Sequence, residues 1–409
     1  MNKKILAISW YMPPILAPQS IQVGYICNAL VDLGWEVTVI TAAAQQTARY
    51  ETLDPGLSEV MGKRYHQIDV LPADETLFGR IYRRTIKNPL RVDTKTLWAA
   101  WTAWRVREVI RGDKFSAVIS FAHPWSDHAI GYLLKHTYGL PWAAHFSDPW
   151  VDNPYIRWTP EVRAHVEQLE AAYIGNADAI FFTNEPTRQR VMSKYPSAWL
   201  DKASVIAHGY DAAVADRFRA EPAPATKLSL IYTGTFYGLR TPEPLFKALT
   251  LLPPLLRASL DVRLIGNMPS RYADQMRAMQ LEDVISVLPP LPYRETLQAV
   301  AGSDVALIID AASDDVNLFL PSKIADYFAV GKPVFGITPL QGATADALRA
   351  LNMPIASPDD AEGIARELTA LIEQWRAGGL RLTEQQKQEI TRYEMRRSIA
   401  PLHNWLLTI

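Results

Sequence analysis

Residues 228–243 read Leu-Ser-Leu-Ile-Tyr-Thr-Gly-Thr-Phe-Tyr-Gly-Leu-Arg-Thr-Pro-Glu. The first six residues predict a buried strand that ends at Gly234. Thr241 is expected to be the N-cap of the following helix, with Pro242 as its first residue. Free amide groups at a helix start, with Arg240 beside them, favour the binding of a phosphate. A tight turn with a solvated arginine explains these residues equally well.

The same alternation of a short strand and a longer helix runs along the whole chain, which is typical of parallel βαβ units. Strands are expected at residues 4–9, 36–41, 117–121, 142–146, 179–183, 204–207, 228–233, 261–265, 284–288, 305–309 and 333–337. A Pro/Ala-rich linker at residues 221–226 separates the two sets, so we predict two doubly wound α/β domains. Ligands of such sheets bind beyond the carboxyl ends of the strands. A cleft between the two domains is therefore the expected site.

The composition excludes several classes of protein. The chain has 409 residues, of which 48% are hydrophobic, and 42 basic side chains oppose 43 acidic ones. A single small module, a disordered scaffold and a globally basic nucleic-acid-binding protein are excluded. A lone cysteine, Cys27, cannot form an internal disulfide, so we expect a cytoplasmic protein. No apolar run reaches the length of a membrane span, so any membrane association would be peripheral.

A second candidate site follows the strand predicted at residues 305–309. Pro321 and Ser322 are expected to start a helix that stops at Gly331. Lys323 and Asp326 lie three residues apart, on one face of its first turn. The lysine suits a phosphate, and the aspartate could accept hydrogen bonds from a ribose diol. A surface ion pair is the alternative interpretation.

Several motifs occur in an order that is shared with one enzyme family. They are Ser9-Trp-Tyr-Met-Pro13-Pro14, His145-Phe-Ser147-Asp148-Pro149-Trp150, His208-Gly209-Tyr210-Asp211, Tyr232-Thr-Gly234-Thr235, and Pro321-Ser322-Lys323-x-x-Asp326-Tyr327 with Gly331-Lys-Pro-Val. Together they resemble the retaining nucleotide-sugar glycosyltransferases of family 4. The resemblance covers nearly the whole chain and implies the GT-B fold, with two Rossmann-like domains facing a central cleft. It implies an acceptor domain at residues 1–220, a donor domain at 221–389, and a helix at about 390–409 that crosses back to the first domain.

The resemblance also implies a donor site. Family members carry two glutamates eight positions apart, and the matching residues here are Leu318 and Asp326, so only the second keeps a carboxylate. Arg240 and Lys323 would hold the diphosphate, and Gly234 would let it approach the backbone. Amides near Asn317, Leu318 and Phe319 would face the transferred sugar, and residues from Leu291 to Tyr293 would meet the base. Thr235 and Ser322 complete the donor set.

The acceptor site is expected in the first domain, where Pro18 and Gln19 belong to the first loop. His123 follows a strand and matches a family histidine beside the two sugars, although a structural role is the alternative. Asp148 could bind acceptor hydroxyls or stabilise positive charge on the sugar ring, or it could cap its own loop. Trp150 is assigned to the acceptor by the resemblance, whereas His145 is expected inside the edge of the sheet.

Sugar transfer requires stabilisation of a leaving diphosphate and placement of a hydroxyl. The predicted catalytic set is His123, Asp148, Arg240 and Lys323. No Asp-x-Asp motif occurs, so we expect neither a metal nor a cofactor. The resemblance implies front-face attack, in which the leaving phosphate oxygen takes the acceptor proton.

Two other functions compete with transfer. One is a sugar-nucleotide epimerase of the same fold, which would need paired acid and base carboxylates. The other is a catalytically silent nucleotide-sugar-binding module, which Leu318 in place of a carboxylate would suit. A dehydrogenase and a kinase-like enzyme are disfavoured, since no Gly-x-Gly-x-x-Gly follows the first strand and no Walker motif occurs.

Residues 80–114 are strongly basic, with ten basic side chains against three acidic ones. Trp98, Trp101 and Trp104 recur there at three-residue spacing. Such a segment could lie on an anionic membrane surface, at the inner face of the cell membrane, with a lipid-linked acceptor. A core-facing tryptophan stripe with a solvated basic face is the alternative.

Overall fold

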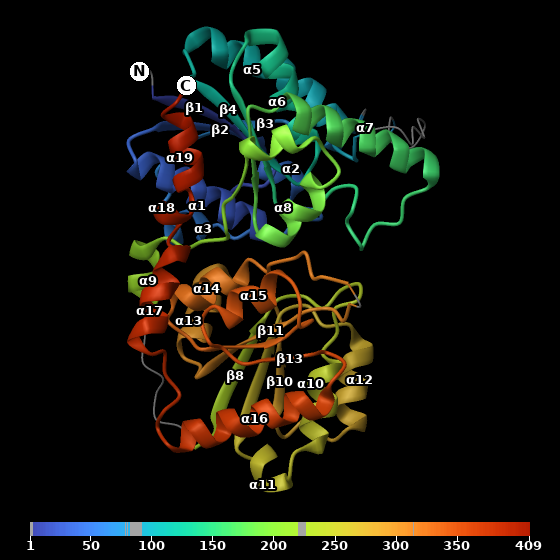
Figure 1. The fold of residues 1–409 in the computed structure, drawn as a ribbon, viewed down its shortest axis with the longest axis vertical. Helices are drawn as coiled ribbons and strands as arrows, with labels where there is room; N and C mark the ends of the chain where they lie inside the picture. The colour runs from blue at the N-terminus through green and yellow to red at the C-terminus, as the bar shows by residue number, and fades with distance from the viewer. Residues whose placement is uncertain (1–2, 78, 80, 82–91, 220–225, 314) are drawn as a thin grey trace. The chain divides into compact units, whose positions relative to one another are not determined.

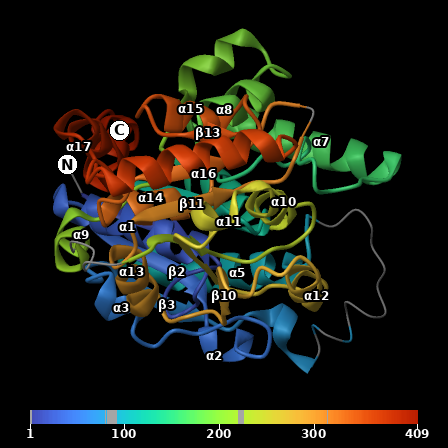
Figure 2. The same ribbon diagram turned by 90° about the horizontal axis from the view of Figure 1, so that it is seen from below.

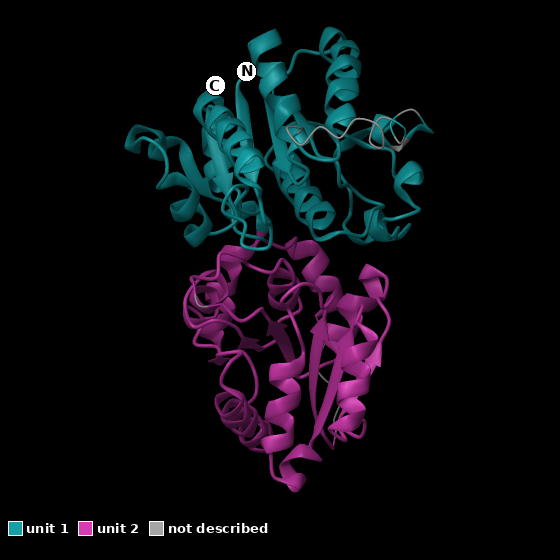
Figure 3. Ribbon diagram, turned by 90° about the vertical axis from the view of Figure 1, so that its right-hand side faces the viewer, with its two compact units in different colours: residues 1–208, 395–409 teal, residues 209–394 magenta. Residues whose placement is uncertain are grey.

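The computed structural model describes residues 3–77, 79, 81, 92–219, 226–313 and 315–409 (Figure 1). The chain divides into two compact units, which Figure 3 distinguishes by colour. Unit 1 comprises Met1–His208 and Met395–Ile409, and unit 2 comprises Gly209–Glu394. The linker predicted at residues 221–226 lies outside the described residues except for Thr226.

Unit 1 contains a parallel sheet of seven strands in the order β3-β2-β1-β4-β5-β6-β7. The strands are β1 (Lys4–Ile8), β2 (Glu36–Ala42), β3 (His66–Val70), β4 (Ala117–Ala122), β5 (Trp142–Phe146), β6 (Ala179–Phe182) and β7 (Ala203–Val205). The helices are α1 (Pro18–Asp32), α2 (Ala44–Thr47), α3 (Leu57–Val60), α5 (Thr96–Gly112), α6 (Ser126–Tyr138), α7 (Pro160–Asn176), α8 (Glu185–Met192), α18 (Met395–Ser398) and α19 (Ala400–Leu406), with 3-10 turns η1 (Ala73–Glu75) and η2 (Ser197–Lys202). The chain winds outward in both directions from β1 and β4, which are neighbours. The loops after these two strands therefore flank the switch point, where ligands of open α/β sheets bind.

Unit 2 repeats this plan with six parallel strands in the order β10-β9-β8-β11-β12-β13. The strands are β8 (Leu228–Thr233), β9 (Leu260–Ile265), β10 (Ile285–Leu288), β11 (Val305–Ile309), β12 (Val334–Ile337) and β13 (Ile355–Ala356). The helices are α9 (Ala212–Phe218), α10 (Glu243–Leu251), α11 (Pro254–Arg257), α12 (Ser270–Ala278), α13 (Tyr293–Ala301), α14 (Lys323–Ala329), α15 (Ala343–Arg349), α16 (Ala361–Arg376) and α17 (Glu384–Ile390), with the 3-10 turn η3 (Thr391–Tyr393). Its switch point lies between β8 and β11. These are the strands whose following loops carry Arg240 and Lys323.

Both sheets are buried because helices cover their faces. Every residue of β4, β8 and β11 is buried, as parallel strands with two covered faces require. In unit 2 the amphipathic helix α16 packs beside α10, and Figures 1 and 2 show the two helices next to each other. The prediction of two doubly wound domains is therefore confirmed.

The predicted strands differ from the observed ones by one or two residues at most, but β3 and β13 were not predicted. Both are edge strands that pair with a single neighbour. The β3 sequence His-Gln-Ile-Asp-Val carries only two apolar residues, and β13 has two residues in all. Neither offers the apolar run by which buried strands are recognised.

The end of the chain belongs to unit 1, which confirms the expected return to the first domain. The Trp35 indole Nε1 donates a hydrogen bond to His403 Nδ1 at 3.1 Å. The Ser398 hydroxyl donates to the carbonyl of Ala207 at 2.7 Å. Leu402 and Leu406 are buried. The return begins at Met395, so residues 390–394 remain in unit 2.

Candidate active site

The loop after β8 begins with a close crossing of two glycines in unit 2. Gly234 has φ 143° and Gly266 has φ 140°, both in the region that favours glycine. A Cβ at Gly266 would collide with the carbonyl oxygen of Gly234, and a Cβ at Gly234 would collide with Lys323 Nζ. Glycine at 234 therefore leaves room for the lysine ammonium group at the carboxyl end of the sheet. Thr235, the next residue, is partly buried.

Helix α10 starts later than predicted. It begins at Glu243 with Pro242 at the N-cap, because the Thr241 hydroxyl accepts the Glu243 amide two residues on, at 3.1 Å. The threonine thus satisfies a helix-start amide through a local turn. Arg240 precedes this turn, and its guanidinium group lies 5.4 Å from the centre of the Tyr237 ring. The Arg240 side chain is only 14% exposed, so the alternative of a solvated arginine is wrong.

Lys323 opens α14 and points toward the end of β8. Its Nζ lies 3.9 Å from the centre of the Tyr232 ring, a cation–π contact. Burial lowers the pKa of Lys323 well below its usual value, and the nearby charge of Arg240 lowers it further. Two cations are thus held close together in a poorly hydrated place. Such an arrangement favours an anion that would relieve their repulsion.

Asp326 is engaged by a tyrosine. The Tyr293 hydroxyl, at the start of α13, donates a hydrogen bond of 2.7 Å to Asp326 Oδ1. Burial raises the pKa of Asp326 to about 7, although this hydrogen bond and Lys323 both oppose the shift. Leu291 lies just before Tyr293, and its carbonyl accepts the Thr296 hydroxyl at 3.3 Å. A surface ion pair does not describe Lys323 and Asp326, since both are partly buried and each has a tyrosine neighbour.

The loop from Asn317 to Ser322 is tied to the rest of unit 2. The Asn317 amide donates to the carbonyl of Gln341 at 3.0 Å, and the Phe319 amide donates to Asn317 Oδ1 at 3.1 Å. These two backbone amides have partners within unit 2, and the assignment of the amides near Asn317, Leu318 and Phe319 to the transferred sugar stays a prediction. Leu318 is 6% exposed, while Ser322 is partly buried at the N-cap of α14.

In unit 1, His123 and Asp148 lie together. His123 Nε2 is 3.6 Å from Asp148 Oδ2, and the two side chains are 39% and 34% exposed. His123 follows β4 and Asp148 follows β5, which pair in parallel. The Ser147 hydroxyl ties the two loops by donating to the carbonyl of Ala122 at 2.8 Å. An accessible imidazole and carboxylate thus meet at the carboxyl edge of the sheet, where acid–base chemistry is possible.

Of the other predicted acceptor residues, Trp150 is fully buried, Pro18 is exposed and Gln19 is partly buried. Trp150 stacks on Trp125, with ring centres 4.7 Å apart, so its predicted acceptor contact is corrected to a packing role. Pro18 begins α1, and the Gln19 side chain donates to the carbonyl of Phe121 at 3.1 Å. Pro18 and Gln19 thus belong to the first turn of α1 rather than to the loop before it, and Gln19 joins this turn to the end of β4.

Among the buried carboxylates that the sequence analysis did not identify, Asp310 and Glu170 bear on the predicted site residues. Asp310 directly follows β11, a position that the strand-end rule could have identified. Glu170 on α7 accepts the Val151 amide at 3.0 Å, the Tyr195 hydroxyl at 2.7 Å and the Lys194 ammonium group. It anchors the loop that carries Asp148, but a glutamate in a helical pattern gives no sign of such a role.

His145 lies inside the sheet, on a strand paired on both sides rather than at the edge. Burial lowers the pKa of His145 to about 3, and the nearby His208 contributes to the shift. Burial also lowers the pKa of His128 well below its usual value. The Ser120 hydroxyl shares a 2.8 Å hydrogen bond with His128 Nδ1. These histidines are neutral parts of the core.

We expect acid to destabilise unit 1 through His145. The unfolded histidine binds a proton below about pH 6.5, whereas the folded one does so only near pH 3. The free energy of unfolding should therefore fall with decreasing pH across this window, by up to about 1.4 kcal/mol per pH unit for this residue. His145→Gln should make the slope from urea unfolding at pH 7, 6 and 5 shallower. The exposed His136→Gln is the control, and equal slopes for both variants would contradict the assignment.

Helix α5 presents two of its three tryptophans to solvent. Trp98 is fully buried and donates its indole N–H to Asp127 at 2.8 Å. Trp101 and Trp104 are 39% and 44% exposed, with ring centres 5.0 Å apart. Arg105 and Arg107 lie within 5.8 Å and 5.3 Å of the Trp104 ring centre. A core-facing stripe is therefore correct for Trp98 only. The basic segment at residues 80–114 can be followed only in part, because five of its ten basic residues lie outside the described residues. They are Arg80, Arg83, Arg84, Lys87 and Arg91.

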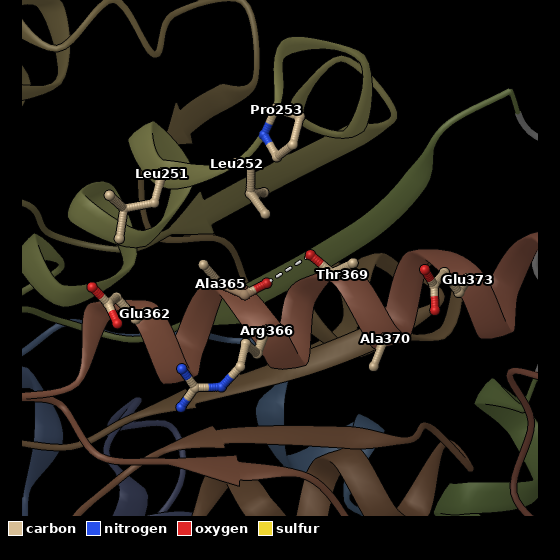
Figure 4. A pocket seen from close by; sticks show the side chains of 9 residues that line it. All are labelled: Leu251, Leu252, Pro253, Glu362, Ala365, Arg366, Thr369, Ala370 and Glu373. Atoms are coloured by element: carbon tan, nitrogen blue, oxygen red, sulfur yellow. Dashed lines mark hydrogen bonds between the residues drawn. The ribbon is translucent and has the colours of Figure 1, made fainter.

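A surface cavity of about 550 Å³ lies elsewhere in unit 2 (Figure 4). Its lining comes from Leu251 at the end of α10, from Leu252 and Pro253 after it, and from one face of α16, including Glu362 and Arg366. No predicted site residue lines it. Among the described residues, no group of three metal-ligating side chains comes together, and none of the described helices has the length and apolar character of a membrane span.

The chain is similar to a known family of enzymes in sequence and in fold. The model of Glycosyltransferase Family 4 matches residues 19–214. Three solved structures share the fold. A glycosyltransferase from Rickettsia africae ESF-5 has a TM-score of 0.69 and 13% identity, with 99% of this chain and 98% of that chain covered. WaaG, a glycosyltransferase involved in lipopolysaccharide biosynthesis, has a TM-score of 0.61 and 14% identity, with 98% of each chain covered. A Listeria monocytogenes protein named as a UDP-N-acetylglucosamine 2-epimerase has a TM-score of 0.58 and 12% identity, with 99% and 95% covered.

At these identities the three structures show the fold alone, and no curated protein matches the chain significantly in sequence. The family model adds a similarity in sequence over residues 19–214. Together they confirm the resemblance to the family 4 glycosyltransferases of the GT-B fold.

Proposed function

We propose that the chain transfers a sugar, with retention of configuration, from a UDP- or GDP-linked donor to a hydroxyl of a saccharide acceptor. Unit 2 would hold the donor and unit 1 the acceptor. One observation carries the proposal. The ammonium group of Lys323 lies over the Tyr232 ring, beside a glycine that leaves room for it at the end of β8, and burial and then the nearby charge of Arg240 lower the pKa of Lys323. A diphosphate would neutralise both cations and accept their hydrogen bonds.

The chemistry follows from these groups. As the bond from the sugar to the diphosphate breaks, negative charge grows on the leaving phosphate oxygen, and Arg240 and Lys323 would stabilise it. That oxygen would take the proton of the acceptor hydroxyl as the new bond forms on the same face. His123 and Asp148 would orient the acceptor hydroxyl and stabilise the positively charged sugar ring. Asp326, which has Tyr293 as its partner, would accept a ribose hydroxyl.

Incubation of the purified protein with UDP- and GDP-sugars tests the proposal. Release of UDP or GDP that continues in the presence of EDTA would support a metal-independent transferase. An NMR spectrum of the product that shows the same anomeric configuration as the donor would support retention. Epimerisation of the donor without acceptor would instead favour the epimerase, whose fold the chain shares. Saturable binding without turnover on any acceptor would favour a silent binding module.

The acceptor is proposed to be lipid-linked, in the assembly of a surface polysaccharide or glycolipid. WaaG, which shares the fold, is named for lipopolysaccharide biosynthesis. The exposed Trp101–Trp104 pair on α5 has arginines beside it, as in segments that lie at the surface of an anionic bilayer. Contact of α5 with the inner face of the cell membrane would bring the acceptor to unit 1.

We expect the double variant Trp101→Ser, Trp104→Ser to bind anionic vesicles about tenfold more weakly, since two half-buried aromatic rings would no longer enter the interface. Sedimentation with phosphatidylglycerol and phosphatidylcholine vesicles measures this, and binding should weaken with salt. Leu255→Ser, which removes an 84% exposed apolar side chain from unit 2, is the control. Equal binding of wild type to both lipids would contradict the membrane proposal.

A further inference from the structure

Three loops of unit 2 meet at the carboxylate of Asp310. The residue directly follows β11, and its side chain is 4% exposed. Its Oδ2 accepts hydrogen bonds from Asn317 Nδ2 at 3.0 Å and from the Thr338 hydroxyl at 2.9 Å. Its Oδ1 faces Arg240, whose Nη2 lies 3.6 Å away. The carboxylate therefore contacts the loops after β8, β11 and β12, three neighbouring strands of the sheet.

The two oxygens of this carboxylate differ in what they do. Oδ2 is satisfied by two donors, and both are neutral. Oδ1 is buried and has no hydrogen-bond partner among the described residues, so its interaction with Arg240 is an ion pair too long for a hydrogen bond. A buried carboxylate without a cation would be costly, and attraction between buried charges is stronger than at a surface. Arg240 thus stabilises the negative charge of Asp310. The same attraction holds the Arg240 guanidinium group near the carboxylate.

We propose that Asp310 is the positioning residue of the donor site, holding the Arg240 guanidinium group in place for the diphosphate and tying it to the Asn317 loop. The inference rests on the proposed function of this site. Oδ1 is shielded from solvent, so Asp310 acts through Arg240 rather than by touching the ligand. Lys323 feels the same carboxylate, which opposes the lowering of its pKa. One buried negative charge therefore serves both cations.

Asp310→Asn keeps the size of the side chain and an oxygen that can accept from Asn317 and Thr338, but it removes the negative charge facing Arg240. We expect the affinity for UDP, GDP or inorganic pyrophosphate, measured by calorimetry, to fall about tenfold. In an Arg240→Gln background the same change should alter affinity less than twofold, because the group through which Asp310 acts is absent. A purely structural role would lower the melting temperature without this dependence on Arg240.

The chain offers a matched control at the other end of the same strand. Asp304 precedes β11 and accepts the Ser229 amide and hydroxyl at 2.8 and 2.7 Å. Asp304→Asn should lower stability and leave the affinity for the three probes unchanged. An equal loss of affinity from Asp310→Asn in the wild-type and Arg240→Gln backgrounds, or no loss at all, would overturn the inference while leaving the donor site intact. If the wild type binds none of the three probes, the proposed function fails and the inference fails with it.

Discussion

Lys323→Ala should lower the affinity for UDP about thirtyfold to a hundredfold. A hydrogen bond to a charged group contributes about 1.5 to 3 kcal/mol, and the ammonium group lies in a poorly hydrated place where its attraction for a diphosphate is strong. The free energy of unfolding should change by less than about 1 kcal/mol. Loss of the contact with the Tyr232 ring is offset by relief from burial and from repulsion by Arg240. Isothermal calorimetry and urea unfolding measure the two effects.

Lys247→Ala is the matched control for this experiment. Lys247 is exposed on α10, in the same unit. None of the hydrogen bonds of the described residues joins it to a site residue. Its removal subtracts the same charge from the unit without touching the loop after β8. Equal UDP affinities for the two variants would show that Lys323 does not bind the diphosphate. The proposed site requires that UDP affinity depend on the position of the lysine and not on the net charge of the unit.

Gly266→Ala should be among the most damaging single substitutions in unit 2. The new Cβ would overlap the carbonyl oxygen of Gly234, and backbone cannot swing aside as a flexible side chain can. The φ of 140° adds strain for any residue with a side chain. We expect a loss of at least about 2 kcal/mol in the free energy of unfolding. Because the displaced segment carries Gly234, UDP binding should weaken as well.

Gly302→Ala provides the comparison. Gly302 has φ −80°, and its Cβ would meet the Gln298 carbonyl oxygen at 3.5 Å, an ordinary contact. We expect a change within about 0.5 kcal/mol, measured by the same urea unfolding. A Gly266→Ala protein as stable as the Gly302→Ala protein would contradict the close crossing of the two loops.

The sequence predicted the sheets well because their strands are buried on both faces. The strands predicted at residues 228–233 and 305–309 match the observed ones at both ends. Of the four edge strands in the two described sheets, β7 and β10 were predicted, whereas β3 and β13 were missed because β3 carries only two apolar residues and β13 has only two residues. Helix starts were less certain, since the Thr241 hydroxyl can satisfy an amide either as a cap or in the turn before it.

Within the site, the sequence identified the charged residues but not their surroundings. Arg240, Lys323 and His123 follow strands, so their place at a carboxyl edge could be predicted. Whether a side chain there is exposed depends on packing from distant segments. Trp150 follows a strand in the same way yet is buried against Trp125. Helical spacing likewise could not tell which of the three α5 tryptophans enters the core.

The return of residues 395–409 to unit 1 has a consequence for synthesis on the ribosome. Unit 2 is encoded as a continuous insertion, so all of its residues emerge before unit 1 receives its last two helices. Unit 2 can therefore complete its core during translation, whereas unit 1 still lacks these two helices and the surface around Trp35 stays uncovered. A chain truncated after residue 394 should consequently show a protease-resistant second half and a sensitive first half.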